Sequence, residues 1–149
     1  MSASASTPQA PTKIELLELL AAIGTAQWRD FAAAAARHGL TGNQAKVLDH
    51  LRSDPLPMRG LAERLICDAS NITGIVDRLE DHGLVRREPS ATDRRVKNVT
   101  ITDEGLETIR RVRAEMQATH SALDTLDTEE SATLYALLDR LRPSMERSI

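Results

Sequence analysis

The stretch between residues 57 and 102 constrains the fold more than any other part of the chain. It begins with two short helical patterns close together and continues with two strand-like runs on either side of an arginine-rich loop. In the second helical pattern the apolar residues recur at i, i+3, i+4 and i+7, which places them on one buried stripe: Ile72, Ile75, Val76 and Leu79. Gly83 follows this stripe and suits the left-handed conformation that ends many helices. Two helices joined by a tight turn and followed by a β-hairpin predict a winged helix-turn-helix.

Capping-box patterns mark the start of three further helices. They are Thr12 with Glu15, Thr41 with Gln44, and Asp127 with Glu130. The first helix is predicted to run from about Lys13 to His38 and to end at Gly39. The helix that Thr102 caps is predicted to run unbroken to about Thr125, and the last helix to end at Pro143. Asp68 is the expected N-cap of the helix over residues 69–82, and the strands are expected over 84–88 and 96–102.

The predicted fold class is mainly α with a small β-wing, an α+β winged helix-turn-helix. Residues 1–12 are Ser-, Ala-, Thr- and Pro-rich and are expected to form a disordered tail, whereas 13–149 form a single domain. Within this domain, residues 41–102 are expected to form the winged helix-turn-helix. The helices of 13–38 and 103–149 are expected to form a dimerisation region, because their apolar residues exceed what a lone winged helix requires. A monomer with a helical side-bundle is the alternative.

Apolar stripes on three long helices carry the expectation of a homodimer, and the stripe of the last helix comprises Leu134, Leu137, Leu138 and Leu141. The first follows the opening helix through Leu17, Leu20, Gly24, Trp28, Phe31 and Ala35. The second has the alternating spacing of a helix that packs along its length against a partner, and it comprises Ile109, Val112, Met116, Thr119, Leu123 and Leu126. The run of alanines from Ala32 to Ala36 permits close approach of a neighbouring helix.

The distribution of charge restricts where a polyanion could bind. The formal net charge is −3, so the chain has no global basic field of the kind that attracts nucleic acid. Basic residues nevertheless gather on the predicted hairpin, where only Glu88 and Asp93 oppose Arg86, Arg87, Arg94, Arg95 and Lys97. Affinity for phosphate is therefore expected on one face only.

The remaining composition points to a cytoplasmic protein. Cys67 is the single cysteine, so no intramolecular disulfide can form and a reducing compartment fits. The simplest interpretation of Cys67 is a small, buried apolar residue. Because it precedes the expected DNA-reading helix, oxidation of its thiol could perturb DNA binding. The first dozen residues lack the pattern of a signal peptide, and no apolar segment approaches membrane-spanning length.

The order and spacing of three segments resemble the MarR family of bacterial transcription regulators. The junction between the first two helices of the family resembles HGLTGNQAKVLDHL. Its helix-turn-helix and first wing strand resemble LAERLICDASNITGIVDRLEDHGLVRRE, and its wing, with an Asp-x-Arg signature, resembles ATDRRVKNVTITDEG. The resemblance extends from about Leu16 to Leu141. It implies a winged-helix dimer whose N- and C-terminal helices interlock.

The resemblance also assigns residues to DNA. Residues 69–82 match the recognition helix, so the major groove is expected to meet Ser70, Asn71, Thr73 and Arg78. Arg95 matches the wing arginine that reaches the minor groove, and Asp93 matches the acid that braces it. Gly74 stands where relatives often carry arginine, which removes one charged contact, and Pro57 stands where a capping serine or threonine is usual.

The chemistry of these residues favours DNA without the resemblance. Asn71 can read an adenine edge, and Ser70 and Thr73 can reach a base or a phosphate. Arg94, Arg95 and Lys97 lie on a hairpin that can follow the DNA backbone or enter a narrow minor groove, where the negative potential is enhanced. Arg86 and Arg87 alternate across a strand, so only one of them is expected to point at DNA.

An effector site is the remaining candidate. Trp28 and Phe31 either pack in the core of a dimer or line a cleft between the first helix and the winged lobe. In relatives this cleft binds phenolic or other anionic effectors, and Arg29 could neutralise a carboxylate there. No cofactor and no metal are expected, because the histidines are scattered along the chain: His38, His50, His82 and His120. Catalytic motifs are lacking, so the protein is not expected to be an enzyme.

These observations predict a homodimeric, sequence-specific DNA-binding transcriptional regulator. It is expected to repress from a pseudo-palindromic operator in double-stranded DNA and to be released by a small aromatic or anionic effector. Two alternatives stay open. One is a dimeric winged-helix module that binds protein, and the other is a DNA binder without an effector.

Overall fold

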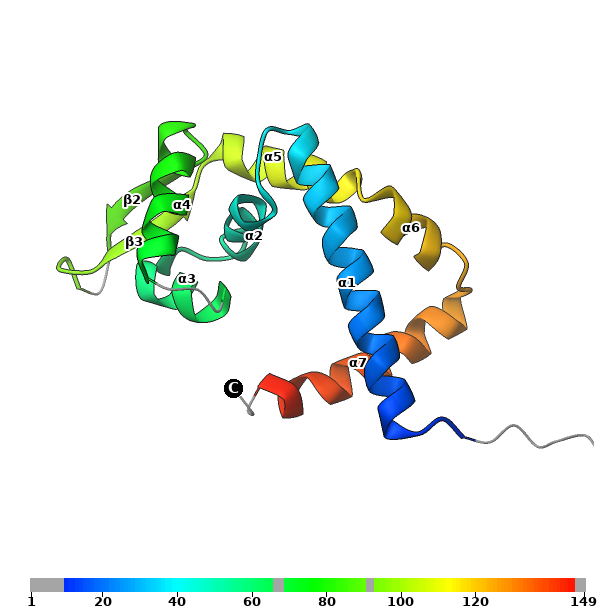
Figure 1. The fold of residues 1–149 in the computed structure, drawn as a ribbon. Helices are drawn as coiled ribbons and strands as arrows, with labels where there is room; N and C mark the ends of the chain where they lie inside the picture. The colour runs from blue at the N-terminus through cyan, green and yellow to red at the C-terminus, as the bar shows by residue number, and fades with distance from the viewer. Residues whose placement is uncertain (1–9, 66–68, 91–92, 147–149) are drawn as a thin grey trace, which may run out of the picture.

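The structure is a computed structural model that describes residues 10–65, 69–90 and 93–146. Within them the helices are α1 (Lys13–Arg37), α2 (Gly42–His50), α3 (Met58–Leu65), α4 (Ala69–Asp81), α5 (Asp103–Ala114), α6 (Gln117–Leu123) and α7 (Thr128–Glu146). The strands are β1 (Leu56–Pro57), β2 (Val85–Pro89) and β3 (Lys97–Ile101). Figure 1 shows one lobe formed by the strands with α2, α3 and α4, and a second region formed by α1, α6 and α7. The predicted fold class, mainly α with a small β-wing, is confirmed.

The predicted helix starts are confirmed by their hydrogen bonds. The Thr12 hydroxyl accepts from the Glu15 backbone N–H at 3.2 Å, and the Glu15 carboxylate accepts from the Thr12 N–H at 2.7 Å. The reciprocal pair recurs at Thr41 with Gln44 and at Asp127 with Glu130. Each pair satisfies backbone donors that a helix N-terminus otherwise leaves without partners.

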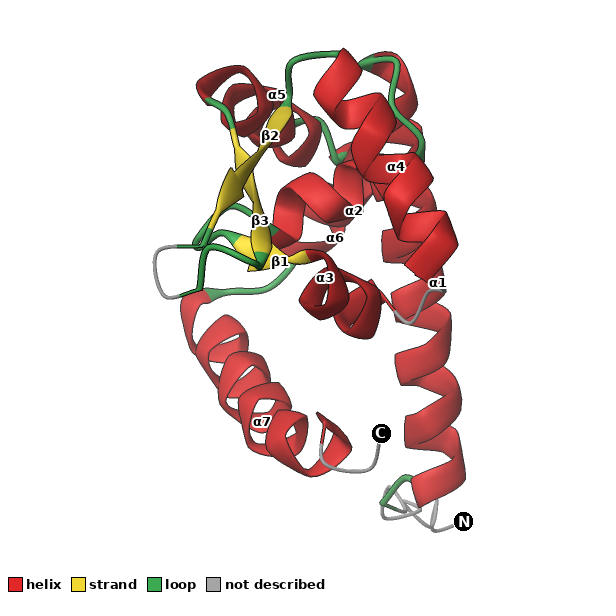
Figure 2. Ribbon diagram, turned by 90° about the vertical axis from the view of Figure 1, so that its left-hand side faces the viewer, coloured by secondary structure: helices red, strands yellow, loops and turns green. Residues whose placement is uncertain are grey.

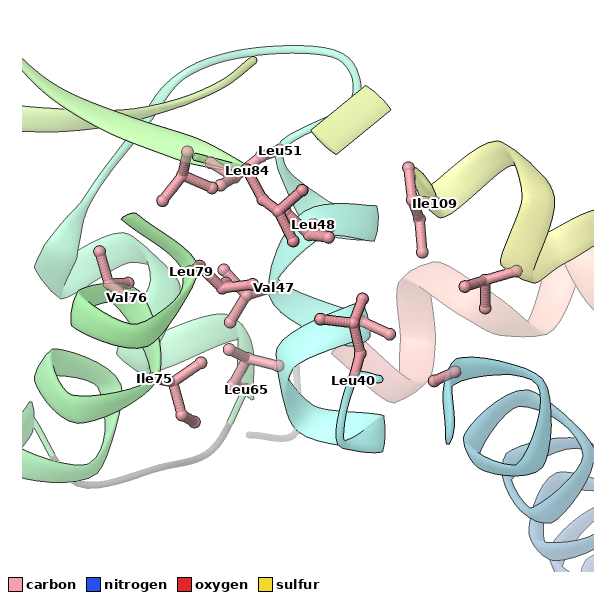
Figure 3. Close-up of a cluster of buried hydrophobic side chains, with 14 of the residues drawn as sticks. Leu40, Val47, Leu48, Leu51, Leu65, Ile75, Val76, Leu79, Leu84 and Ile109 are labelled. Carbon is pink, nitrogen blue, oxygen red and sulfur yellow. The ribbon is translucent and has the colours of Figure 1, made fainter. Parts of the chain in front are cut away.

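The core of the lobe is built on the apolar stripe of α4. Ile72, Val76 and Leu79 are completely buried, as the periodicity predicts. They meet the inner face of α2 and the residues that enter the sheet, among them Val47, Leu48 and Leu84 (Figure 3). Burying each such side chain contributes about 1.5–3 kcal/mol, so this cluster dominates the stability of the lobe. Gly83 ends α4 with φ +70°, the left-handed conformation predicted for it.

The sheet contains a strand that the sequence did not indicate. The strand order is β1-β3-β2, and both pairings are antiparallel. Leu56 pairs with Val99 and Pro57 with Asn98, so the segment expected only to separate two helices forms an edge strand. A two-residue strand shows no periodicity, and proline is tolerated at a sheet edge because its missing N–H is not needed there. β2 and β3 lie within one residue of their predicted bounds.

The unbroken helix predicted after Thr102 is wrong, because it is divided between Ala114 and Gln117 into α5 and α6. The break is held by contacts from α1. Arg37 donates to the Glu115 backbone carbonyl at 2.7 Å and to its carboxylate at 3.0 Å, and the Asp30 carboxylate accepts from the Thr119 N–H at 2.7 Å. The hydrogen bond from Thr119 lowers the pKa of Asp30, and the hydrogen bond from Arg37 lowers the pKa of Glu115.

The prediction that the last helix stops at Pro143 is also wrong, since α7 continues to Glu146. A proline close to a helix end removes one intrahelical hydrogen bond, and the remaining backbone bonds sustain the final turn. The first residue of α7 and its capping pattern agree with the sequence prediction.

The stripe expected to pack along its length against a partner is divided between two environments. Ile109, Val112 and Met116 are buried in the core of this chain, so that expectation is wrong for them. Helical spacing shows that a face is buried but does not say whether the covering surface belongs to the same chain. Phe31 and Ala35 of α1 are likewise buried within the chain, where α1 packs on α2 and α5.

Apolar side chains remain exposed on the rest of α1 and on α7. On α1 they are Ile14, Leu16, Leu17, Leu19, Leu20 and Ile23, and on α7 they are Leu134, Tyr135, Leu137, Leu138 and Leu141. Figure 2 shows that these two helix segments extend beyond the winged lobe. Among the described helices, none is both long and apolar enough to cross a membrane.

Gly105 is required by the close packing of α5 on the lobe. A Cβ atom at Gly105 would lie 2.1 Å from the Leu84 carbonyl oxygen, which already accepts from the Thr102 N–H at 3.1 Å. Backbone fixed in this way cannot retreat, so Gly105→Ala should lower the free energy of unfolding by about 1–3 kcal/mol. Urea denaturation measures the loss. Gly74→Ala is the control, because a Cβ atom there meets nothing within 4 Å. Equal stability of the two variants would contradict the close approach.

Candidate nucleic-acid interface

The helix-turn-helix presents one polar face of α4 to solvent. Asn71, Thr73, Gly74 and Arg78 are exposed, whereas the apolar stripe of the same helix is buried. Ser70 lies in the first turn of α4, but its side chain is outside the described part, as are Cys67 and the predicted N-cap Asp68. The predicted recognition helix thus exposes Asn71, Thr73 and Arg78, groups that can donate to or accept from base edges and phosphates.

In the wing hairpin, hydrogen bonds join the described residues on either side of positions 91 and 92. The Asp93 carboxylate accepts from the Arg95 N–H at 3.0 Å, the Val96 N–H donates to the Asp93 carbonyl at 2.9 Å, and the Ser90 N–H donates to the Val96 carbonyl at 2.8 Å. Asp93 therefore holds the main chain of Arg95. Among the described side chains, no ion pair joins Asp93 to the Arg95 guanidinium.

The basic side chains of the wing lie in solvent. Arg94, Arg95 and Lys97 are all exposed, and they are displayed around a turn whose backbone is closed by hydrogen bonds. Figure 1 shows the hairpin projecting from the lobe next to α4. The basic hairpin and the polar helix face therefore belong to one lobe of an otherwise acidic chain, whose formal net charge is −3. This placement gives the lobe a local attraction for phosphate groups.

The two arginines of β2 have different surroundings. The Arg86 side chain is 59% exposed, and its Nε lies 2.7 Å from Glu88 Oε1. Arg87 is only 21% exposed and makes ion pairs with Asp77, at 2.5 Å, and with Glu80. Its backbone N–H also donates to Glu80 at 2.9 Å. Arg86 is therefore the one of the pair that points to solvent, and Arg87 is bound to α4.

The Arg87 cluster was missed by sequence reasoning. Burial of the guanidinium lowers the pKa of Arg87, but the hydrogen bonds to Asp77 and Glu80 more than offset this and raise it. A usable signal was present: two carboxylates three residues apart on a helix, followed by a strand arginine on the same side of the sheet as buried Val85. The separation in sequence concealed the pairing.

A second candidate site is a cavity of about 350 Å³ between α1, α2 and the α5–α6 break. Trp28 and Phe31 line it, with ring centroids 5.9 Å apart. Lys46 Nζ lies 5.5 Å from the centroid of the Trp28 ring. Arg29 is exposed and is not among the lining residues, so its predicted role in this cavity is not supported.

The polar lining of the cavity was not predicted from the sequence. Arg113 lies 2.8 Å from Asp49 and connects α5 to α2, and both residues line the cavity. The Nε2 atom of His50 is buried and has no hydrogen-bond partner among the described residues. Burial lowers the pKa of His50, and the charge of Lys46 lowers it further, so the imidazole is neutral near pH 7. The cavity therefore combines aromatic faces with cations, and His50, whose Nε2 is buried, is one of its lining residues.

Metal-binding chemistry has no visible basis in the described residues. They contain no group of three or more His, Cys, Asp or Glu side chains that could hold a metal ion. One of the four histidines, His38, contacts Glu115 at 3.1 Å. The expectation that the chain uses no metal or cofactor stays a prediction.

A helix pair with a polar exposed face and a basic hairpin beside it defines a winged helix-turn-helix protein. A model of the MarR family matches residues 38–96 of this chain. The regulator PecS of Dickeya dadantii (strain 3937) is 32% identical over 71% of this chain and 67% of its own length. A putative transcriptional regulatory protein for the hcr operon of Thauera aromatica is 32% identical over 78% and 72%.

Solved structures agree with these relatives. A mutant form of MarR from E. coli superposes with a TM-score of 0.73 at 26% identity, covering 92% of this chain and 100% of that one. The chain belongs to the MarR family of transcriptional regulators. The predicted family membership is thereby confirmed, and these relatives are regulators, not enzymes.

Proposed function

We propose that the protein is a repressor that binds a pseudo-palindromic operator as a homodimer. The observation that carries the proposal is that an exposed polar face of α4 lies beside a basic hairpin in the same lobe. Asn71 and Thr73 would read base edges in the major groove, with Ser70 and Arg78 beside them. Arg94, Arg95 and Lys97 would contact phosphates or the adjacent minor groove, and Arg86 is the outward arginine of the wing strand.

The homodimer is supported by the apolar side chains left exposed on α1 and α7. Residues 13–38 and 103–149 contain these helices, and they would supply the dimerisation region. A monomer rarely leaves so many large apolar side chains in water, and a two-fold interface covers the same surface on both copies. Such a dimer would present its two recognition helices to successive major grooves, about 34 Å apart on one face of the duplex.

Selection of bound sequences from a random duplex pool tests the proposal directly. The purified full chain is used at near-physiological salt, with its mass measured by light scattering in the same buffer. Enrichment of an inverted repeat with half-sites one helical turn apart supports operator reading by a dimer. A folded dimer that enriches no sequence would overturn it and favour the winged-helix module that binds protein.

Arg95→Ala tests the wing. We expect the affinity for every duplex to fall by a similar factor, and the slope of log affinity against log salt to decrease by about one, because one phosphate contact is lost. Fluorescence anisotropy over a range of salt concentrations measures both. Arg111→Ala is the control, since it removes an exposed arginine of α5 that is paired with Glu107. An unchanged affinity and slope for Arg95→Ala would remove the wing from the interface.

Asn71→Ala tests base reading by the helix. We expect the difference in binding free energy between the operator and a random duplex to decrease by about 1–3 kcal/mol. The reason is that a contact to a base edge is lost while the phosphate contacts remain. The selected operator and a scrambled duplex are titrated in parallel. Asn43→Ala, an exposed asparagine in the first turn of α2, is the matched control. Equal losses on the two duplexes would contradict a reading role for Asn71.

The cavity supports a small aromatic or anionic effector. Its aromatic faces, from Trp28 and Phe31, can stack on a ring, and Lys46 and Arg113 can pair with a carboxylate. Because the cavity is lined both by α2 of the winged lobe and by the α5–α6 break, a ligand that prefers one arrangement of these helices would change operator affinity. A DNA binder without an effector is the alternative that the next experiment separates.

Benzoate is a suitable probe because Trp28 is the single tryptophan of the chain. We expect benzoate to quench the fluorescence of Trp28 in a saturable way. We also expect bound benzoate to decrease the affinity of the protein for the operator by about fivefold or more. Lys46→Gln should weaken benzoate binding, because it removes a cation from the cavity. Lys13→Gln at the start of α1 should not, because Lys13 does not line the cavity. Absence of quenching, or equal binding by both variants, would contradict the effector site.

A further inference from the structure

Arg87 occupies the junction between the wing and the recognition helix. It lies on the same side of β2 as the buried Val85, at the point where the apolar core of the lobe gives way to solvent. Its guanidinium contacts Asp77 and Glu80, which lie three residues apart on α4, and its backbone N–H donates to Glu80 as well. One residue of the wing strand therefore holds two carboxylates of the helix by both its side chain and its main chain.

The position of Asp77 connects this cluster to the reading face. Residues at i and i+3 or i+4 share a helix face, so Asp77 lies beside Thr73 and Gly74, which are exposed on α4. The Asp77 side chain is itself 54% exposed. A carboxylate at that place would repel DNA phosphates unless a cation neutralised it, and Arg87 is the cation that contacts it.

We propose that Arg87 is a positioning residue for sequence reading, because it locks the recognition helix to the wing strand so that both meet their grooves in one fixed geometry. The inference rests on the proposed reading of DNA by α4 and the wing. A planar guanidinium can bind two carboxylates in a fixed direction, whereas the ammonium of lysine is a point charge on a flexible stem. The geometry thus depends on arginine and not only on a positive charge.

Three variants separate position from charge. Arg87→Gln removes both the ion pairs and the cation. Arg87→Gln combined with Asp77→Asn restores the net charge of the cluster but not the link between strand and helix. Arg87→Lys keeps the charge and can reach only one carboxylate at a time. The matched control is Arg111→Gln, which makes the same substitution in an exposed ion pair on α5.

The experiment runs the random-pool selection and parallel titrations on the wild-type protein and all four variants. Thermal unfolding establishes that each is folded. For Arg87→Gln we expect operator affinity to fall about tenfold, a loss comparable to one mismatched base pair, with a smaller fall on scrambled duplex. The ratio of operator affinity to scrambled-duplex affinity is therefore expected to be smaller for Arg87→Gln than for the wild type, and to stay equally small in the double variant. The ratio for Arg87→Lys should lie between those of the double variant and the wild type.

The outcomes are distinguishable. If the double variant regains the wild-type ratio, Arg87 acts through charge alone and the inference is overturned. If Arg87→Gln and Arg111→Gln both behave as wild type, it is also overturned, while the proposed DNA reading stands. If Arg87→Gln does not fold, an unchanged ratio in folded Arg87→Lys overturns it and a narrowed ratio supports it. If wild type enriches no sequence, the proposed function fails and this inference fails with it.

Discussion

The burial of the apolar stripe of α4 is the interaction on which the rest of the structure depends. Ile72, Val76 and Leu79 are completely buried, and this orientation leaves the opposite face of the helix in solvent. A rotation of α4 about its axis would expose the stripe at a cost of about 1.5–3 kcal/mol for each side chain. The polar face is therefore fixed by the hydrophobic core behind it. The Arg87 contacts then connect this fixed helix to the wing.

A second set of contacts joins the winged lobe to the outer helices. The C-terminal part of α1 packs on α2 and α5, and its Arg37 and Asp30 bind the backbone on either side of the α5–α6 break. These polar contacts take the place of hydrogen bonds that a continuous helix would make between its own residues. The break redirects the chain toward α7, so the direction of the outer helices depends on side chains of α1. Figure 1 shows this change of direction where α5 leads into α6.

The sequence predicted those features that repeat at a fixed period or have a local hydrogen-bond signature. The stripe of α4, the capping boxes and the hairpin all belong to this group, and so does the positive φ of Gly83. The failures have a common cause, which is tertiary contact. The break at Glu115 is held by Arg37, and the strand at Leu56 exists only through its pairing with β3. The partners of Arg87, Glu80 and Asp77, lie seven and ten residues away. Local pattern contains no information about the partners of Glu115 and Leu56, and the signal for the Arg87 cluster was divided between a helix and a strand. In the cavity, Trp28 and Phe31 were candidates because they are two of the three aromatic residues of the sequence, whereas Arg113 and His50 lie on other helices.

The placement of the cavity gives a physical condition for any coupling between ligand and DNA. It is lined on one side by Lys46 and His50 of α2, which belongs to the lobe, and on the other by Thr119 and Leu123 of α6. The Asp49–Arg113 pair crosses between α2 and α5 at its wall. A ligand that bound every arrangement of these helices equally would change nothing, however tightly it bound. Coupling therefore requires a ligand that contacts both sides and fits one separation better. Lys46 of α2 and Arg113 of α5 are the two cations whose geometry toward a ligand would change with that separation.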